Sequence, residues 1–95
     1  MTVAYYIIAV HYKDNDSNTY IDEIKTLEHG IKSRTTVVGD IESGKTVMTA
    51  VKGSDGKYYA GEKVHVITVN GYKYLRTDAN STPRDNLENL PTYNK

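Results

Sequence analysis

The chain has 95 residues, no cysteine, and 12 basic residues balanced by 12 acidic ones. This length suits a single domain over residues 1–95. The missing thiols exclude disulfides and thiolate chemistry, and the balanced charge argues against nucleic-acid binding. The longest apolar run, residues 3–10, is too short to cross a bilayer and lacks signal-peptide features. We therefore expect a cytoplasmic protein that makes no contact with membranes.

The first half of the chain predicts strands around one short helix. Residues 3–12 are apolar at odd and even positions alike, as in a central strand covered on both faces. Residues 20–28 are ambiguous, because their apolar positions fit a helical stripe whereas the short polar turn before them favours a hairpin strand. Residues 33–44 predict a short helix with capping residues at its start and Gly44 at its end.

The next segment predicts two strands and a turn. Residues 47–51 are strand-like, and residues 53–56 contain the glycines and aspartate typical of a turn. Residues 57–60 then lead across Gly61, where we expect a β-bulge, into the strands of a further hairpin.

Asn70 and Gly71 are the strongest local signal in the chain. They lie between two runs of β-branched and aromatic residues, and a type I′ turn requires φ > 0 at both of its central residues. This turn places Val66 opposite Leu75 on a core-facing side. The other face carries an aromatic and basic strip made of His65, Tyr72, Tyr74 and Arg76. Such a strip suits a flat or anionic ligand, but the tyrosines could equally pack as a second layer while Arg76 pairs with a carboxylate.

Residues 39–46 match the phosphate-binding loop pattern at every fixed position: glycine, four residues, then Gly-Lys-Thr. In a true loop of this kind a long helix follows the pattern, whereas strand-like residues follow here and two acidic residues lie inside it. We interpret the match as a coincidence at the end of a helix.

Metal and catalytic motifs are incomplete. Asp14, Asp16 and Asn18 imitate the start of a calcium loop, but Thr19 and Lys25 occupy the positions that require glycine and a carboxylate. The three histidines lack zinc-ligand spacing, and no serine lies in a nucleophile-elbow motif. We therefore expect no metal, no cofactor and no catalytic activity.

A C-terminal signature is more specific. Tyr-Leu-Arg-Thr at residues 74–77, followed by Asp-Asn-Leu at 85–87 and Leu-Pro at 90–91, resembles that of a family of small bacterial and phage proteins without characterised function. The resemblance implies a strand at residues 20–28 and gives no activity. The expected fold is α+β, a curled and mainly antiparallel sheet of about five strands in the order β-β-α-β-β-β. Residues 1–77 form its sheet and helix, and residues 78–95 form an irregular tail packed on them.

The signature has two interpretations. In the first, Arg76 pairs with Asp85 and latches the tail over an open edge of the core. In the second, Arg76, Asn86 and the hairpin tyrosines line a ligand pocket.

Two functions follow. The first is a noncatalytic protein, of phage origin by analogy, that binds or sequesters a nucleotide-like signal as a homo-oligomer. Tyrosine rings would stack on the base, and arginines would contact phosphate. The predicted ligand-binding residues are His65, Tyr72, Tyr74, Arg76, Arg84 and Asn86. The alternative is a protein-interaction module, for example an inhibitor of a host defence protein, that engages its partner through sheet edges and tyrosines.

Overall fold

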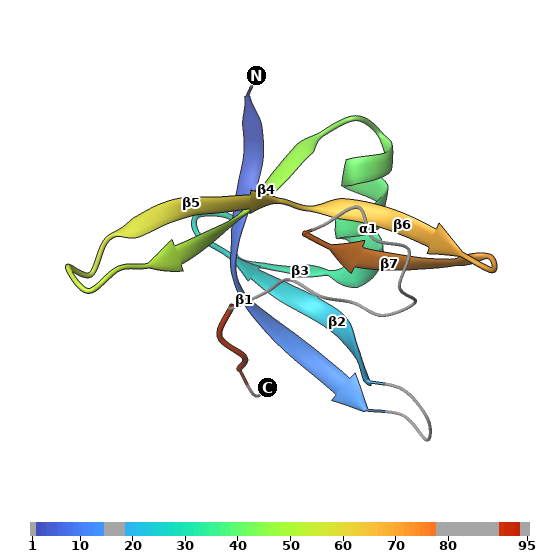
Figure 1. Ribbon diagram of the computed structural model, residues 1–95, viewed down its shortest axis with the longest axis horizontal. Coiled ribbons are helices and arrows are strands. Elements are labelled where there is room, and N and C mark those ends of the chain that lie inside the picture. Colours follow the sequence, from blue (N-terminus) through green and yellow to red (C-terminus); the bar gives the residue numbers. More distant parts are fainter. Residues whose placement is uncertain (1, 15–18, 78–89, 94–95) are drawn as a thin grey trace.

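One helix and seven strands make up the described chain, in a computed structural model that describes residues 2–14, 19–77 and 90–93. In chain order they are β1 (Val3–Asp14), β2 (Thr19–Thr26), β3 (Ile31–Ser33), α1 (Arg34–Glu42), β4 (Thr46–Lys52), β5 (Tyr58–Lys63), β6 (His65–Val69) and β7 (Tyr72–Arg76). Five strands form a mixed sheet in the order β3-β2-β1-β4-β5, and β6 pairs with β7 separately (Figure 1). The predicted α+β class is confirmed.

The strand β1 is central, as its apolar run predicts. It pairs antiparallel with β2 and parallel with β4. Its register shifts between Ile7 and Ala9, and this bulge allows Ile7 and Val10 to enter the same core cluster although they are three residues apart. The parallel pairing with β4 makes the sheet mixed rather than purely antiparallel.

Residues 19–26 form the strand β2, so the helical periodicity of this stretch was misleading and the resemblance was right. The physical reason is a second bulge. His11 pairs with Glu23 and the next residue of β1 pairs with Ile21, which leaves Asp22 as the extra residue. Ile21 and Ile24 are therefore both fully buried at a spacing of three, which imitates one face of a helix.

The helix α1 forms for local reasons. The Ser33 side chain caps its start by accepting a hydrogen bond from the backbone N–H of Thr36, and Gly44 follows its end with φ of 101°. Val37 on this helix is fully buried in the core. Because the helix precedes Gly44 and a strand follows it, the order is the reverse of a phosphate-binding loop.

The predicted bulge at Gly61 is present between β4 and β5. Ala50 pairs with Ala60, but Met48 pairs with Lys63, so β5 carries one extra residue. A Cβ at Gly61 would lie 2.4 Å from Thr49 Oγ1, a spacing that requires glycine unless neighbouring atoms shift. A break at Val64 then separates β5 from β6. This break and the short strand β3 give seven strands where about five were expected.

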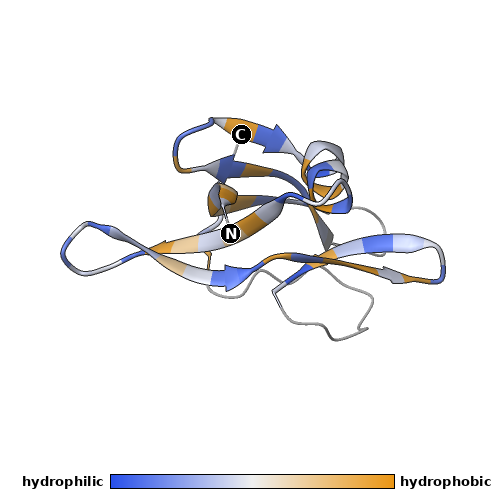
Figure 2. Cartoon of the chain, turned by 90° about the horizontal axis from the view of Figure 1, so that it is seen from above, coloured by the Kyte–Doolittle hydropathy of each residue, from blue (hydrophilic) through white to orange (hydrophobic). Residues whose placement is uncertain are grey.

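The hairpin of β6 and β7 has the predicted register. Val69 pairs with Tyr72 and Val66 with Leu75, and Asn70 and Gly71 have φ values of 53° and 83°. This hairpin and that of β4 and β5 extend to opposite sides of the body (Figure 1). The loops at both ends are hydrophilic, while apolar residues follow the strands towards the centre (Figure 2).

The core also receives the described C-terminal segment. Leu90 is 8% exposed and belongs to the core cluster. Pro91 accepts a hydrogen bond from the Val10 N–H at 3.0 Å, and the Tyr93 N–H donates to the Val10 carbonyl at 3.1 Å. The segment thus runs beside the second half of β1. Within the described chain, α1 is too short to span a bilayer.

Candidate functional site

The predicted binding strip lies on one face of the β6–β7 hairpin. His65 pairs with Arg76 across the hairpin, and Tyr72 and Tyr74 follow on the same face. Their accessibility differs, because Tyr72 is 69% exposed whereas Arg76 is 4% exposed. The guanidinium therefore presents little surface to a ligand. Arg84, Asn86 and the possible latch residue Asp85 lie outside the described residues.

A groove lies on the other side of this hairpin, where β7 faces α1. Its volume is about 350 Å³. The lining residues are Arg34, Thr35, Val38, Gly39, Glu42 and Lys73. Lys73 is flanked by Tyr72 and Tyr74, and alternation along the strand directs its side chain to the face opposite the predicted strip. The groove thus combines two cations, one carboxylate and a small apolar floor.

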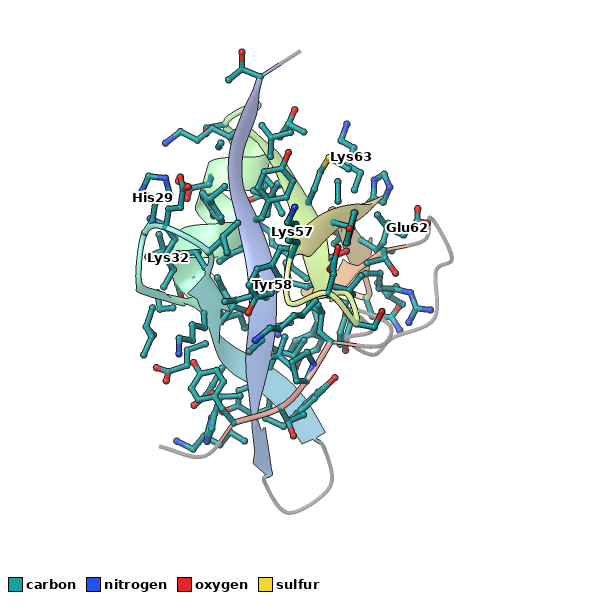
Figure 3. The ribbon with its side chains drawn as sticks, turned by 90° about the vertical axis from the view of Figure 1, so that its left-hand side faces the viewer. His29, Lys32, Lys57, Tyr58, Glu62 and Lys63 are labelled. Carbon is teal, nitrogen blue, oxygen red and sulfur yellow. The ribbon has the colours of Figure 1, made fainter. Side chains whose placement is uncertain are left out.

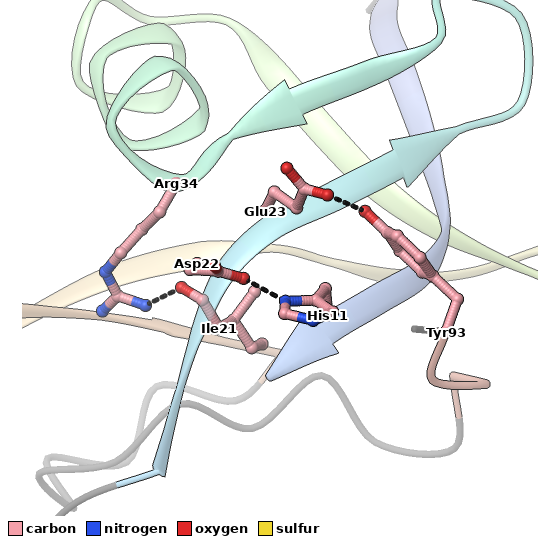
Figure 4. Close-up of polar contacts among 6 residues, drawn as sticks. All are labelled: His11, Ile21, Asp22, Glu23, Arg34 and Tyr93. Atoms are coloured by element: carbon pink, nitrogen blue, oxygen red, sulfur yellow. Dashed lines mark hydrogen bonds and ion pairs between the residues drawn. The ribbon is translucent and has the colours of Figure 1, made fainter. Parts of the chain in front are cut away.

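Arg34 fixes the geometry of the groove. Its Nη1 donates to the Ile21 carbonyl at 2.8 Å (Figure 4), and its Nη2 donates to the Lys73 carbonyl at 2.6 Å. The guanidinium also lies 5.9 Å from the ring centre of Tyr20. One side chain therefore connects the start of α1 with both β2 and β7.

An ion pair between Lys73 and Glu42 also lines the groove. Lys73 Nζ lies 2.8 Å from Glu42 Oε1, and the two side chains are 46% and 43% exposed. An exposed pair of this kind contributes about 0–1 kcal/mol. It can open at little cost, and Lys73 is then available to an anion in the groove.

Gly39 lies inside α1 and lines the groove. Glycine within a helix is less favourable than alanine by about 0.5–1 kcal/mol. A Cβ at Gly39 would meet no atom within 4 Å, so close packing does not explain the glycine. Its effect is to leave the backbone uncovered and the floor of the groove open.

A second polar cluster anchors the C-terminal segment (Figure 4). His11 Nδ1 and Asp22 Oδ1 are 2.5 Å apart, and the Tyr93 hydroxyl donates to Glu23 Oε1 at 3.1 Å. Burial, then the hydrogen bond to Glu23, raises the pKa of Tyr93 to about 12. The ring of Tyr93 also contacts that of His11. The described residues contain no group of three acidic or histidine side chains suited to a metal. We interpret this cluster as a structural contact that holds the C-terminal segment against β1 and β2.

Sequence reasoning missed the groove. Arg34, Gly39, Glu42 and Lys73 are absent from the predicted set, and the unusual glycine within a helix was the one local signal. Comparison with known protein families gives a match over most of the chain. The model of a family described as "Protein of unknown function (DUF3892)" matches residues 6–91. No curated protein and no solved structure is significantly similar to the chain.

Proposed function

The chain belongs to DUF3892, a family of proteins of unknown function, and from its own geometry we propose that it is a noncatalytic protein that binds a nucleotide-like small molecule in the α1–β7 groove. The observation that supports this most is Gly39. Glycine is unfavourable within a helix, and no neighbouring atom would exclude a larger side chain at position 39. Gly39 lines the groove. Loss of stability in exchange for an open surface is typical of binding sites.

The groove suits this ligand class in size and chemistry. Its volume of about 350 Å³ lies within the range of about 300–1,000 Å³ found for small-molecule sites. A flat ring can lie over Val38 and the bare backbone of Gly39. A phosphate can then lie near Arg34 and Lys73, since guanidinium and ammonium groups are the usual phosphate partners.

A panel of mono-, di- and cyclic nucleotides, screened by thermal shift and measured by calorimetry, tests the proposal. Gly39→Ala should stabilise the free protein by about 0.5–1 kcal/mol, because it improves the helix. The same change should weaken binding about tenfold or more, because the methyl group enters the groove. Few other mutations would raise stability and lower affinity together.

Two further variants complete the test. Lys73→Ala should weaken binding, and Lys52→Ala, which removes an exposed lysine outside the groove lining, is the matched control. A protein that binds no nucleotide of the panel contradicts the proposal. So does a Gly39→Ala protein that binds as tightly as the unmodified chain.

A protein-interaction module is the second candidate, and the exposure of Tyr72 favours it. This ring is 69% exposed on a hairpin that projects from the body, and exposed tyrosines are common contacts at protein interfaces. A photo-crosslinking amino acid at position 72 should capture a defined protein in cells, whereas the same probe at position 52 should not. Phage origin and action against host defence stay predictions.

A further inference from the structure

The strand β5 is an outer strand with an accessible edge. It lies at the end of the five-stranded sheet, and no described strand pairs with its outer side. All six of its residues are exposed, in contrast to β7, whose last two residues, Leu75 and Arg76, are buried. Figure 3 shows Tyr58, Glu62 and Lys63 of this strand and Lys57 just before it. Unpaired backbone groups on such an edge are a template for another strand.

The bulge decides which side chains share a face of β5. Val51 pairs with Tyr59, and the Gly53 N–H donates to the Lys57 carbonyl, so Lys57 and Tyr59 lie on the same face. The Glu62 N–H donates to Thr49 Oγ1 within the bulge. Since Lys63 pairs with Met48 on the opposite face, Glu62 returns to the face of Lys57 and Tyr59. Lys57, two residues before Tyr59, and Glu62, three residues after it across the bulge, therefore flank Tyr59 on one face.

We propose that β5 pairs antiparallel with β5 of a second copy of this chain, around a two-fold axis at Tyr59. In this register Lys57 of each copy lies opposite Glu62 of the other, and the two copies of Tyr59 face each other at the axis, each ring keeping its contacts with Gly53 and Asp55 of its own hairpin. Opposite charges in directly facing positions stabilise antiparallel strands. The contact uses the same patch on both copies, so it closes at a dimer.

The charge pattern selects this register and this occupant. A two-fold axis at Glu62 would place two carboxylates opposite each other, and an axis at Ala60 would leave Lys57 without an anion. Lysines and bulges on an outer strand normally discourage pairing. A strand without an acidic residue opposite Lys57 would meet an unmatched lysine and a bulge here, whereas a second copy brings a carboxylate to each Lys57. This inference is independent of the proposed groove ligand.

Sedimentation velocity over a wide range of protein concentration tests the dimer. Lys57→Glu and Glu62→Lys each place like charges in facing positions and should each raise the dimer dissociation constant about tenfold or more. The double variant K57E/E62K restores opposite charges and should restore the dimer. Lys25→Glu, an exposed lysine on β2, is the control and should leave the dimer unchanged.

Both altered residues are exposed, so each variant should keep the circular dichroism spectrum of the unmodified chain and, at concentrations where that chain is monomeric, its thermal midpoint. A chain that stays monomeric at every concentration overturns the proposal. A dimer that tolerates both single reversals, or that the double variant fails to restore, forms through another surface and overturns it as well.

Discussion

The β4–β5 hairpin and the β6–β7 hairpin leave the same body in opposite directions, but they are held in different ways. In the first, the outer strand β5 is exposed at all six positions and depends on its ladder with β4. In the second, Leu75 is fully buried and Arg76 nearly so. Arg34 and the Lys73–Glu42 pair then connect that hairpin to α1. Core side chains and polar bonds fix one hairpin, whereas backbone pairing and a few side-chain hydrogen bonds, without a buried side chain, fix the outer strand of the other.

The difference indicates two distinct uses. A strand whose side chains are buried in the core keeps a constant position against α1, and the wall of a small-molecule groove requires such a fixed position. A strand held by one edge leaves its other edge available for pairing. The two proposals therefore fall on the two hairpins, and mutations that separate the hairpins also separate the proposals.

The largest contrast should come from truncating one large side chain on each outer strand. Leu75→Ala leaves a cavity in the core and should destabilise the protein by about 2–5 kcal/mol. Tyr58→Ala removes a 39% exposed ring and should change stability by about 0.5 kcal/mol or less. Equilibrium unfolding in urea measures both. Equal losses would mean that β5 is supported by the core in the same way as β7.

Arg34→Ala should have an intermediate effect. It removes both donors to the Ile21 and Lys73 carbonyls, and loss of such bonds costs about 1–3 kcal/mol. Hydrogen exchange should accelerate in β6 and β7 while the β4–β5 amides keep their protection. Arg34→Lys is the matched control and should restore little, because one ammonium group cannot reproduce the fork that reaches two carbonyls. Full recovery with lysine would show that charge alone holds the hairpin.

Features that depend on neighbouring residues were predictable from the sequence. The register of β6 and β7 follows from the turn chemistry of Asn70 and Gly71, and the helix follows from the cap at Ser33. The stretch of β2 was ambiguous because the extra residue Asp22 converts a spacing of two into a spacing of three. A bulge has no reliable sequence signature, so periodicity there indicates the wrong element.

The groove was beyond local reasoning. The Arg34 side chain and the Lys73 carbonyl are 39 residues apart in sequence and meet only because the hairpin folds back on α1. Strand alternation correctly placed Arg76 on the tyrosine face, but it gives the face of a side chain and not its depth. Accessibility depends on what packs over that face, and Arg76 is 4% exposed.

The smallest expected effect concerns the tips of the two hairpins. The β4–β5 tip is closed by its own side chains, because Asp55 accepts hydrogen bonds from the Tyr59 hydroxyl and from the Lys57 N–H. These bonds, the Tyr59 bond most strongly, lower the pKa of Asp55. Tyr59→Phe should therefore raise the pKa of Asp55 towards its ordinary value, as carboxyl carbon NMR across the acid range would measure. Tyr58→Phe on the same strand is the control.

The sign of the pH dependence follows from the lowered pKa of Asp55. A carboxyl group with a lowered pKa in the folded state favours the closed tip above its unfolded pKa, and this contribution disappears as the pH falls through the folded pKa. Opening should stay local, since Asp55 and Tyr59 are exposed, and global stability should not change measurably. The tip at Asn70 and Gly71 contains no carboxylate and should show no such transition. An Asp55 pKa that Tyr59→Phe leaves unchanged would show that the Tyr59 hydroxyl does not hold this tip closed.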